Sequence, residues 1–348
     1  MIAFEKTPVF EFGSDFHYCI DFSSDNENIL SKKKEAHYFA NGRQAIQHLL
    51  IHSKWKRIWI PTYFCYSIVE AIKQTDIKIA FYDDSPLSDD RNLISNIKFN
   101  PNDVLLRMNY FGLRTWRDNV STPVAVIEDH SHDLCGEWIE KSNADWIIAS
   151  VRKTLPVPEG GVLWSPKKHK IPNAPKSTLE NDLLAYKRLS AMLMKTLYLS
   201  QSEISKETFR KLYIDTEGDF EKLSVCAIED FCKRLIETLD IKEWYQQKKE
   251  NWKLLSDIES GNFKILYPED ISKCNPFALI LQFSSIKQRD IFKSNLIQKQ
   301  VYPAVLWNIP QEQSQEIVNI GQTLLSIHCD ARYDSQDVAL LKKQLLSI

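Results

Sequence analysis

The stretch VAVIEDHSHDLCGEWIEKSNADWIIASVRKTLPVPEGGVLW, residues 124–164, decides the fold expected for this chain of 348 residues. Three short apolar runs lie within it, at residues 124–127, 146–149 and 162–164. Continuous apolar runs of this length are typical of strands that are buried on both faces of a sheet. The first run leads to Asp129, and the second leads to Ser150 and Lys153. We therefore expect these three polar side chains to lie towards one edge of a sheet.

An acid, a serine and a lysine in this arrangement suit pyridoxal phosphate. The lysine amine forms an imine with the cofactor aldehyde, the acid keeps the pyridine nitrogen protonated, and a hydroxyl three residues before the lysine reaches the phosphate. Taken singly, Lys153 is more often a surface lysine and Asp129 more often a helix cap. Their order behind apolar strands, followed by Glu159-Gly160-Gly161, favours the cofactor site.

Four short motifs in the first half of the chain carry a resemblance to a known family. They are Val126-Ile127-Glu128-Asp129-His130-Ser131-His132, Lys153 with Glu159-Gly160-Gly161, Pro61-Thr62-Tyr63, and Asn109-Tyr110-Phe111-Gly112. In the same order they resemble "VIEDAAQ", "K…EGG", "PSY" and "HLYG" of the DegT/DnrJ/StrS sugar aminotransferases, which are fold type I pyridoxal-phosphate enzymes. The resemblance implies an α/β fold with a mostly parallel central sheet flanked by helices, and a smaller α+β C-terminal domain.

The resemblance also implies an activity and a set of site residues. The chain would be an aminotransferase that moves an amino group from a donor such as glutamate to a keto sugar linked to a nucleotide. Lys153 would carry the imine and shuttle the proton, while Asp129 would keep the ring nitrogen protonated. The residues expected to bind pyridoxal phosphate are Gly42, Arg43, Cys65, Asp129, His132, Ser150 and Lys153.

The sequence departs from the family pattern at three of these positions. His132 replaces a glutamine at the ring hydroxyl, Cys65 replaces a stacking aromatic residue, and Ser150 lies three rather than five residues before the lysine. Two alternatives therefore stay open. One is a degenerate protein that keeps the fold without transamination, and the other is a different pyridoxal-phosphate enzyme acting on sugars, such as a dehydratase.

Four further residues are candidates for the site, and three of them, Arg332, His130 and Arg152, have two readings each. Asn109 is expected at the substrate site, and Arg332, in a segment that resembles the family's ending, is expected to bind the donor carboxylate unless Asp330 neutralises it at the surface. His130 is either a contact of the cofactor ring or a core histidine. Arg152 either reaches the phosphate or forms an ordinary salt bridge.

Composition limits the other classes of function. A formal net charge of −2 gives no reason to expect a nucleic acid or an anionic membrane as partner. Seven cysteines without a CxxC pair indicate reduced thiols, and no metal site is expected. Without a basic start before an apolar stretch, or an apolar run of about 18 residues, the chain is expected to be soluble and cytoplasmic. Fold type I enzymes build each site at a dimer interface, so the resemblance implies a homodimer.

The order of the remaining elements predicts three parts: an N-terminal arm at 1–35, a large domain at 36–239 and a small domain at 240–348. In the large domain, strands are expected at 57–60, 77–82 and 104–108, and helices after Asn41 and at 63–73, 179–198 and 225–255. Asn41 and Gly42, at the start of the first of these helices, also form a site suited to binding an anion. In the small domain, strands are expected at 277–283, 301–305 and 323–327, and helices at 287–298 and 336–346.

Overall fold

A seven-stranded sheet forms the centre of the structure, a computed structural model that describes residues 9–20, 28–33, 35–88, 93–116, 122–171 and 175–348. Its order is β2-β8-β7-β6-β5-β3-β4, and β8 alone runs antiparallel to its neighbours. The strands are β2 His37–Phe39, β3 Arg57–Pro61, β4 Lys78–Tyr82, β5 Asp103–Met108, β6 Ala125–Asp129, β7 Trp146–Ser150 and β8 Gly161–Trp164. The mostly parallel sheet expected from the sequence is confirmed.

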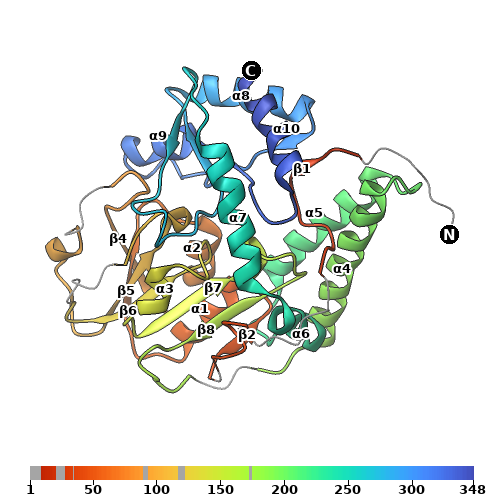
Figure 1. Cartoon of the computed structure of the whole chain (residues 1–348). Helices are drawn as coiled ribbons and strands as arrows, with labels where there is room; N and C mark the ends of the chain where they lie inside the picture. The colour runs from red at the N-terminus through yellow and green to blue at the C-terminus, as the bar shows by residue number, and fades with distance from the viewer. Residues whose placement is uncertain (1–8, 21–27, 34, 89–92, 117–121, 172–174) are drawn as a thin grey trace.

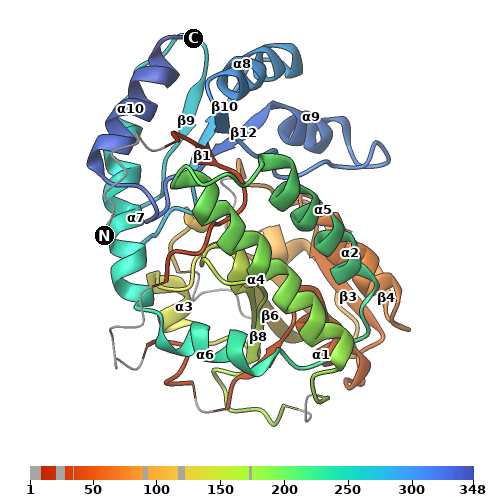
Figure 2. The ribbon, with the colours of Figure 1, turned by 90° about the vertical axis from the view of Figure 1, so that its right-hand side faces the viewer.

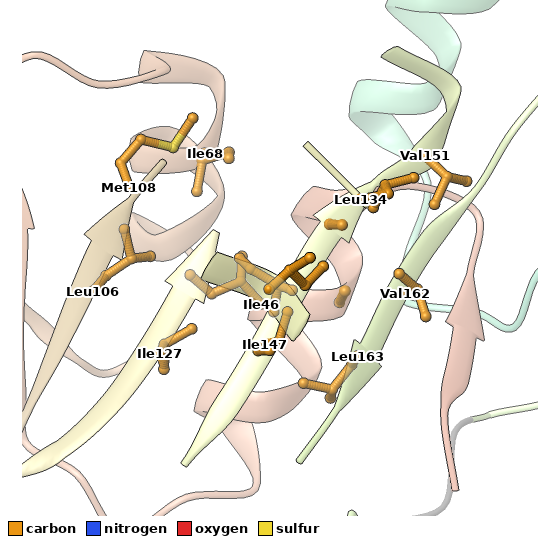
Figure 3. Close-up of a cluster of buried hydrophobic side chains, with 14 of the residues drawn as sticks. Ile46, Ile68, Leu106, Met108, Ile127, Leu134, Ile147, Val151, Val162 and Leu163 are labelled. Carbon is orange, nitrogen blue, oxygen red and sulfur yellow. The ribbon is translucent and has the colours of Figure 1, made fainter. Parts of the chain in front are cut away.

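The apolar runs of the sequence form the middle of this sheet. Strands β5 and β7 are buried along their whole length, as continuous apolar runs require. In Figure 3, side chains of Leu106, Ile127 and Ile147 stand on neighbouring strands and pack with Ile46 of the helix behind them. The register aligns Asp129 with Met108 of β5 and Ile148 of β7, so the carboxyl ends of the parallel strands meet at one edge.

Helix α1, Gly42–Ile51, begins where the sequence predicts. The side chain of its N-cap, Asn41, accepts a hydrogen bond from the N–H of Gln44, and the helix packs against β7 and β8. Helix α2, Tyr66–Lys73, begins later than expected, because the N–H groups of Thr62 and Tyr63 continue the strand pairing with Tyr82 and Asp84. The short helix α3, Glu137–Lys141, and the 3-10 turns η1 Leu93–Asn96, η2 Tyr110–Gly112 and η3 Val151–Lys153 complete this part.

Two long helices form a hairpin on one side of the sheet domain (Figure 2). Helix α4 is Leu179–Leu199 and α5 is Lys206–Lys222. Helix α5 is not predicted from the sequence, because most of its residues are polar and its buried residues form only a narrow face: Phe209, Tyr213, Thr216 and Phe220. The region expected to hold one or two helices forms two, α6 Asp230–Thr238 and α7 Ile241–Ser256.

The C-terminal part has its own small sheet. Strands β9 Lys264–Leu266, β10 Leu279–Gln282 and β12 Leu324–Ile327 are antiparallel in the order β12-β10-β9, with helices α8 Ile286–Gln298, α9 Gln315–Thr323 and α10 Ser335–Leu346 around them. The strand expected at 301–305 is wrong in length. Strand β11 is only Val301–Tyr302, because Pro303 has no N–H to continue the ladder, and Ala304 then bridges to Ser326.

The N-terminal arm joins this small sheet region. Strand β1, Phe12–Gly13, pairs in parallel with β11, and Phe12 is fully buried in the same hydrophobic cluster as Leu325. Helix α7 carries the chain between the two cores, since Tyr245 packs in the larger cluster and Trp252 in the smaller one (Figure 1). Among the described residues, no helix is long and apolar enough to cross a membrane.

Candidate active site

Asp129 lies at the carboxyl end of β6, where the sequence places it. Its side chain is buried, and Oδ1 accepts a hydrogen bond of 2.8 Å from the N–H of Ser131. No other hydrogen bond to this carboxylate is found within the part of the chain that the structure describes. One oxygen therefore remains for a donor such as a protonated ring nitrogen.

Glu128 and His130 belong to a different network, because alternate residues of a strand point to opposite faces. The Glu128 carboxylate accepts hydrogen bonds from Arg107 at 3.1 Å and Trp138 at 2.9 Å, and it lies 3.1 Å from His130 Nε2. Burial acts against the charge, yet the contacts with His130 and Arg107 lower the pKa of Glu128. The contacts of His130 are thus those of a hydrogen-bonded core histidine.

Lys153 closes the short turn η3 after β7. Its side chain is partly buried, and Nζ lies 5.7 Å from the centre of the Trp307 ring. Lys153 also lines a cavity of about 350 Å³ together with Arg152 and Arg188. The amine therefore stands between an aromatic ring and a space of small-molecule size.

His132 lies close to the same amine with a defined tautomer. Its Nδ1 accepts the N–H of Phe111 at 3.1 Å, so in the neutral ring Nε2 carries the hydrogen. Burial lowers the pKa of His132 well below its ordinary value, and the positive charge of Lys153 adds to this shift. Nε2 is buried and has no hydrogen-bond partner among the described residues. His132 thus presents a neutral N–H donor without an acceptor.

Asn109, at the end of β5, is the second buried polar group without partners. Its side chain is 1% exposed, and neither the amide oxygen nor the amide nitrogen has a hydrogen-bond partner in the described part of the chain. A buried amide left this way destabilises a protein by about 1–3 kcal/mol unless something bonds to it. A ligand at this edge of the sheet would supply that partner.

The start of α1 lies directly against β7. A Cβ atom added at Gly42 would come within 2.9 Å of the Ser150 Cβ, so only glycine allows the helix to approach this closely. Close by, Arg43 lies 3.9 Å from Glu217 and Arg152 lies 2.7 Å from it. Arg43 Nη2 and Arg152 Nε are buried without hydrogen-bond partners among the described residues. A helix N-terminus beside two guanidinium groups suits a phosphate.

Two residues bear on the stacking aromatic residue of the family pattern, which this sequence lacks: Cys65, which replaces it, and Trp307. Cys65 precedes α2, and its Sγ lies 3.2 Å from Ser67 Oγ. Trp307 comes instead from the segment between β11 and α9 and stacks on His132, with ring centres 5.5 Å apart and planes inclined by 17°. Trp307 could not be identified from the sequence, because a tryptophan in a loop has no periodicity that indicates its contacts.

Arg332, expected to bind the donor carboxylate, has charged and polar partners within the chain. Its guanidinium is buried against Asp330, with Nε and Nη2 bonding the two carboxylate oxygens at 2.7 Å and 2.9 Å. Nη1 donates to the carbonyl of Asp15 at 3.0 Å, and the group lies 4.2 Å from the centre of the Phe16 ring. Arg332 therefore binds the N-terminal arm through Asp15 and Phe16.

Taken together, the residues fit pyridoxal phosphate. The fit rests on buried groups that have bonding capacity left: Asp129 for the ring nitrogen, His132 Nε2 for a ring oxygen, and Arg43 Nη2 with Arg152 Nε for phosphate oxygens. Among the described residues, no group of three or more histidine, cysteine or acidic side chains is placed to hold a metal ion.

A scan against models of protein families finds no match for the sequence, and a search of curated proteins finds none either. Solved structures match over nearly the whole chain. Helicobacter pylori PseC, an aminotransferase involved in the biosynthesis of pseudoaminic acid, is 11% identical, with a TM-score of 0.61 over 97% of this chain and 99% of its own.

Two further solved structures also match. NtdA of Bacillus subtilis, solved with bound cofactor PMP, is 10% identical with a TM-score of 0.60, covering 96% of this chain and 78% of its own. DesV of S. venezuelae, in complex with a ketimine intermediate, is 12% identical with a TM-score of 0.56, covering 90% and 84%. The chain therefore has the fold of the DegT-like sugar aminotransferases of fold type I.

Proposed function

We propose that this chain is a pyridoxal-phosphate-dependent aminotransferase that acts on a keto sugar, with an amino acid such as glutamate as the donor. The observation that carries the proposal is the set of buried groups with unused bonding capacity, above all His132 and Asn109, around Lys153 and Asp129. The similarity to aminotransferase structures supports the same cofactor.

Each residue has a distinct role in this proposal. The cofactor, when bound, supplies an electron sink for the bond cleaved at the donor's α-carbon. Lys153 holds the cofactor through Nζ and moves the proton at that carbon, and Asp129 keeps the ring nitrogen protonated through its unused oxygen. His132, neutral at physiological pH, donates from Nε2 to a ring oxygen. Trp307 covers one side of Lys153 and excludes water.

The phosphate would be held at the beginning of α1. Gly42 lets the helix approach Ser150, and the first N–H groups of the helix point outwards from this end. Arg43 and Arg152 add charged donors. Asn109 would contact the substrate side of the ring, where its amide lacks partners.

A single labelling experiment tests the assignment. Wild-type protein reconstituted with pyridoxal phosphate should show the visible absorbance of the bound cofactor, and borohydride should fix the cofactor to the peptide that contains Lys153. Addition of glutamate should shift the spectrum. Lys153→Ala should lose all three signals, whereas Lys141→Ala, at an exposed lysine paired with Glu137, should keep them.

Two outcomes would contradict the proposal. Fixation on Lys248, a buried lysine 4.5 Å from the centre of the Tyr245 ring, would move the chemistry out of η3. Cofactor fixed on Lys153 with no response to any amino acid would leave a cofactor-binding protein without transamination.

We also propose that the protein works as a homodimer, supported by an apolar stripe on the outer side of α4. In Figure 2 this helix lies across the front of the molecule, and the stripe consists of Leu179, Leu183, Tyr186, Leu193 and Leu197, which are 44–73% exposed. Large apolar side chains repeated at helical spacing on a surface mark an interaction site.

A further inference from the structure

The groups proposed to contact the cofactor ring are closed off from solvent. Asp129, His132 and Asn109 are 0–1% exposed. His132 Nε2 and both amide atoms of Asn109 have no hydrogen-bond partner among the described residues. The cavity beside Lys153 does not reach these groups, because none of the three residues is part of its lining. A ring that bonds to them can therefore enter only if a covering segment moves.

Trp307 is the side chain that covers this place, and it belongs to segment 303–310 between β11 and α9. Its ring stacks on His132, with centres 5.5 Å apart and planes inclined by 17°, and Lys153 Nζ lies 5.7 Å from the ring centre. The first two residues of the segment line the cavity beside Lys153. Segment 303–310 thus borders both the cavity and His132.

Few contacts hold segment 303–310 in place. Ile309 is buried, Asn308 is exposed, and the other residues of the segment are half-buried. Ala304 exchanges two backbone hydrogen bonds with Ser326, at 2.9 Å and 2.8 Å. From residue 305 to residue 309, no hydrogen bond to another backbone group is found in the described part of the chain. A segment with so few backbone bonds opens at a lower free energy than the core does.

The other rings that pack on His132 are held more firmly. The ring centres of Phe111 and Phe277 lie 5.5 Å and 4.5 Å from that of His132. The N–H of Phe277 donates to the carbonyl of Phe111 at 2.7 Å, and the N–H of Phe111 donates to His132 Nδ1 at 3.1 Å. Trp307 is therefore the neighbour of His132 that can move aside.

Tyr63 ties the middle of the segment to the sheet domain. Its side chain is fully buried, its hydroxyl donates a hydrogen bond to the carbonyl of Leu306, and its ring centre lies 5.6 Å from that of Trp307. Among the described residues, no other side chain bonds to the backbone of segment 303–310. Tyr63 itself is fixed, because its N–H continues the strand pairing by bonding to the carbonyl of Asp84.

We propose that segment 303–310 is a lid that opens to admit the cofactor ring, and that Tyr63 is the positioning residue that holds the lid closed through Leu306. In the closed state Trp307 covers His132 and Lys153, and in the open state both residues are accessible. The inference rests on the proposed function, because pyridoxal phosphate is the ligand that the lid admits.

Chemical labelling of cofactor-free protein tests the lid without the cofactor. Diethyl pyrocarbonate should modify His132 only when the lid opens, whereas His169, whose side chain is 46% exposed, provides the reference rate in the same sample. In Tyr63→Phe the labelling of His132 relative to His169 should be about 5-fold faster, the effect of losing one neutral hydrogen bond. Tyr110→Phe is the matched control. The Tyr110 hydroxyl bonds to the carbonyl of Tyr63 and not to the lid, so this variant should keep the wild-type rate.

The kinetics of cofactor binding give a readout that a general loss of structure would not produce. In rapid mixing followed by cofactor absorbance, Tyr63→Phe should raise both the association and the dissociation rate constants of pyridoxal phosphate about 5-fold. The Kd should stay nearly unchanged, because the free and the bound protein lose the same hydrogen bond. A weaker Kd with an unchanged association rate would make Tyr63 part of the binding site and overturn the inference.

Further outcomes separate the lid from the proposed function. If Tyr63→Phe does not fold, Trp307→Leu decides, because it should also speed the labelling of His132, and an unchanged rate overturns the inference. Equal labelling of wild type and Tyr63→Phe overturns it, as does an equal acceleration in Tyr110→Phe. Faster labelling with no cofactor fixed on Lys153 would retain the lid and refute the aminotransferase. Cofactor fixed on Lys153 with labelling unchanged in Tyr63→Phe would do the reverse.

Discussion

Glu159, in the loop before β8, should make the protein less stable as pH rises through neutrality. Its side chain is fully buried, Oε1 accepts the N–H of Glu229 at 2.7 Å and the amide of Asn181 at 3.3 Å, and Oε2 has no partner among the described residues. Burial raises the pKa of Glu159 from 4.5 to about 8, although the hydrogen bond from Glu229 opposes this shift. The folded protein therefore holds a neutral carboxyl group here at pH 7.

The direction of the pH effect follows from proton counting. Between pH 4.5 and about 8, the folded state keeps the Glu159 proton while the unfolded state has released it. The free energy of unfolding then falls as pH rises, by about 1.4 kcal/mol per pH unit in this window. From pH 4.5 to pH 7 the loss attributable to this carboxyl group is about 3 kcal/mol.

Glu159→Gln imitates the neutral carboxyl group and should remove this dependence. Urea unfolding of cofactor-free protein, followed by tryptophan fluorescence from about pH 5 to pH 8, should show wild type losing stability steeply and the variant losing much less. Glu70→Gln, at an exposed side chain paired with Lys73, should keep the wild-type slope. Parallel pH profiles for wild type and Glu159→Gln would refute the reasoning.

Three further variants test other parts of the site. Asp129→Asn should fold and still bind cofactor, with amino-transfer half-reactions slowed by several orders of magnitude in stopped-flow spectra; normal rates would leave Asp129 a structural role. Trp307→Leu should weaken cofactor binding about 10-fold in a titration, and an unchanged affinity would leave Trp307 without a role at the site. Leu183→Glu should shift a dimer to monomer in light scattering, while Leu346→Glu, equally exposed on α10, should not; a wild-type monomer would end that proposal.

The fold could be predicted from the sequence because its central strands appear there as continuous apolar runs. The apolar runs at 124–127 and 146–149 need burial on both faces, and only a parallel sheet covered by helices offers it. The ends of those runs then place Asp129 and Ser150 at the same edge, as the register shows. Local chemistry also marks the start of α1 at Asn41.

The rest of the site depends on contacts between distant segments, which local patterns do not encode. Trp307 stacks on His132, although the two residues are far apart in the sequence. Glu217 lies on α5, whose polar sequence does not indicate where the helix packs. It forms ion pairs with Arg43, Arg152 and Arg188. The carboxylate-binding role expected for Arg332 remains a prediction. The sequence offers Asp330 as a neighbouring partner of Arg332, whereas the contact of Arg332 with Asp15 in the N-terminal arm has no periodic signature in the sequence.

The pairing of β1 with β11 has a consequence for how the protein is made. Phe12 aligns with Val301 and stacks on Tyr333, with ring centres 3.7 Å apart. During synthesis Phe12 leaves the ribosome long before Val301 and Tyr333 are made. The large sheet can therefore form before β1 has a strand to pair with. Folding of the protein is then complete only after residue 301 has been made, and a nascent chain that stalls earlier leaves Phe12 without its partners.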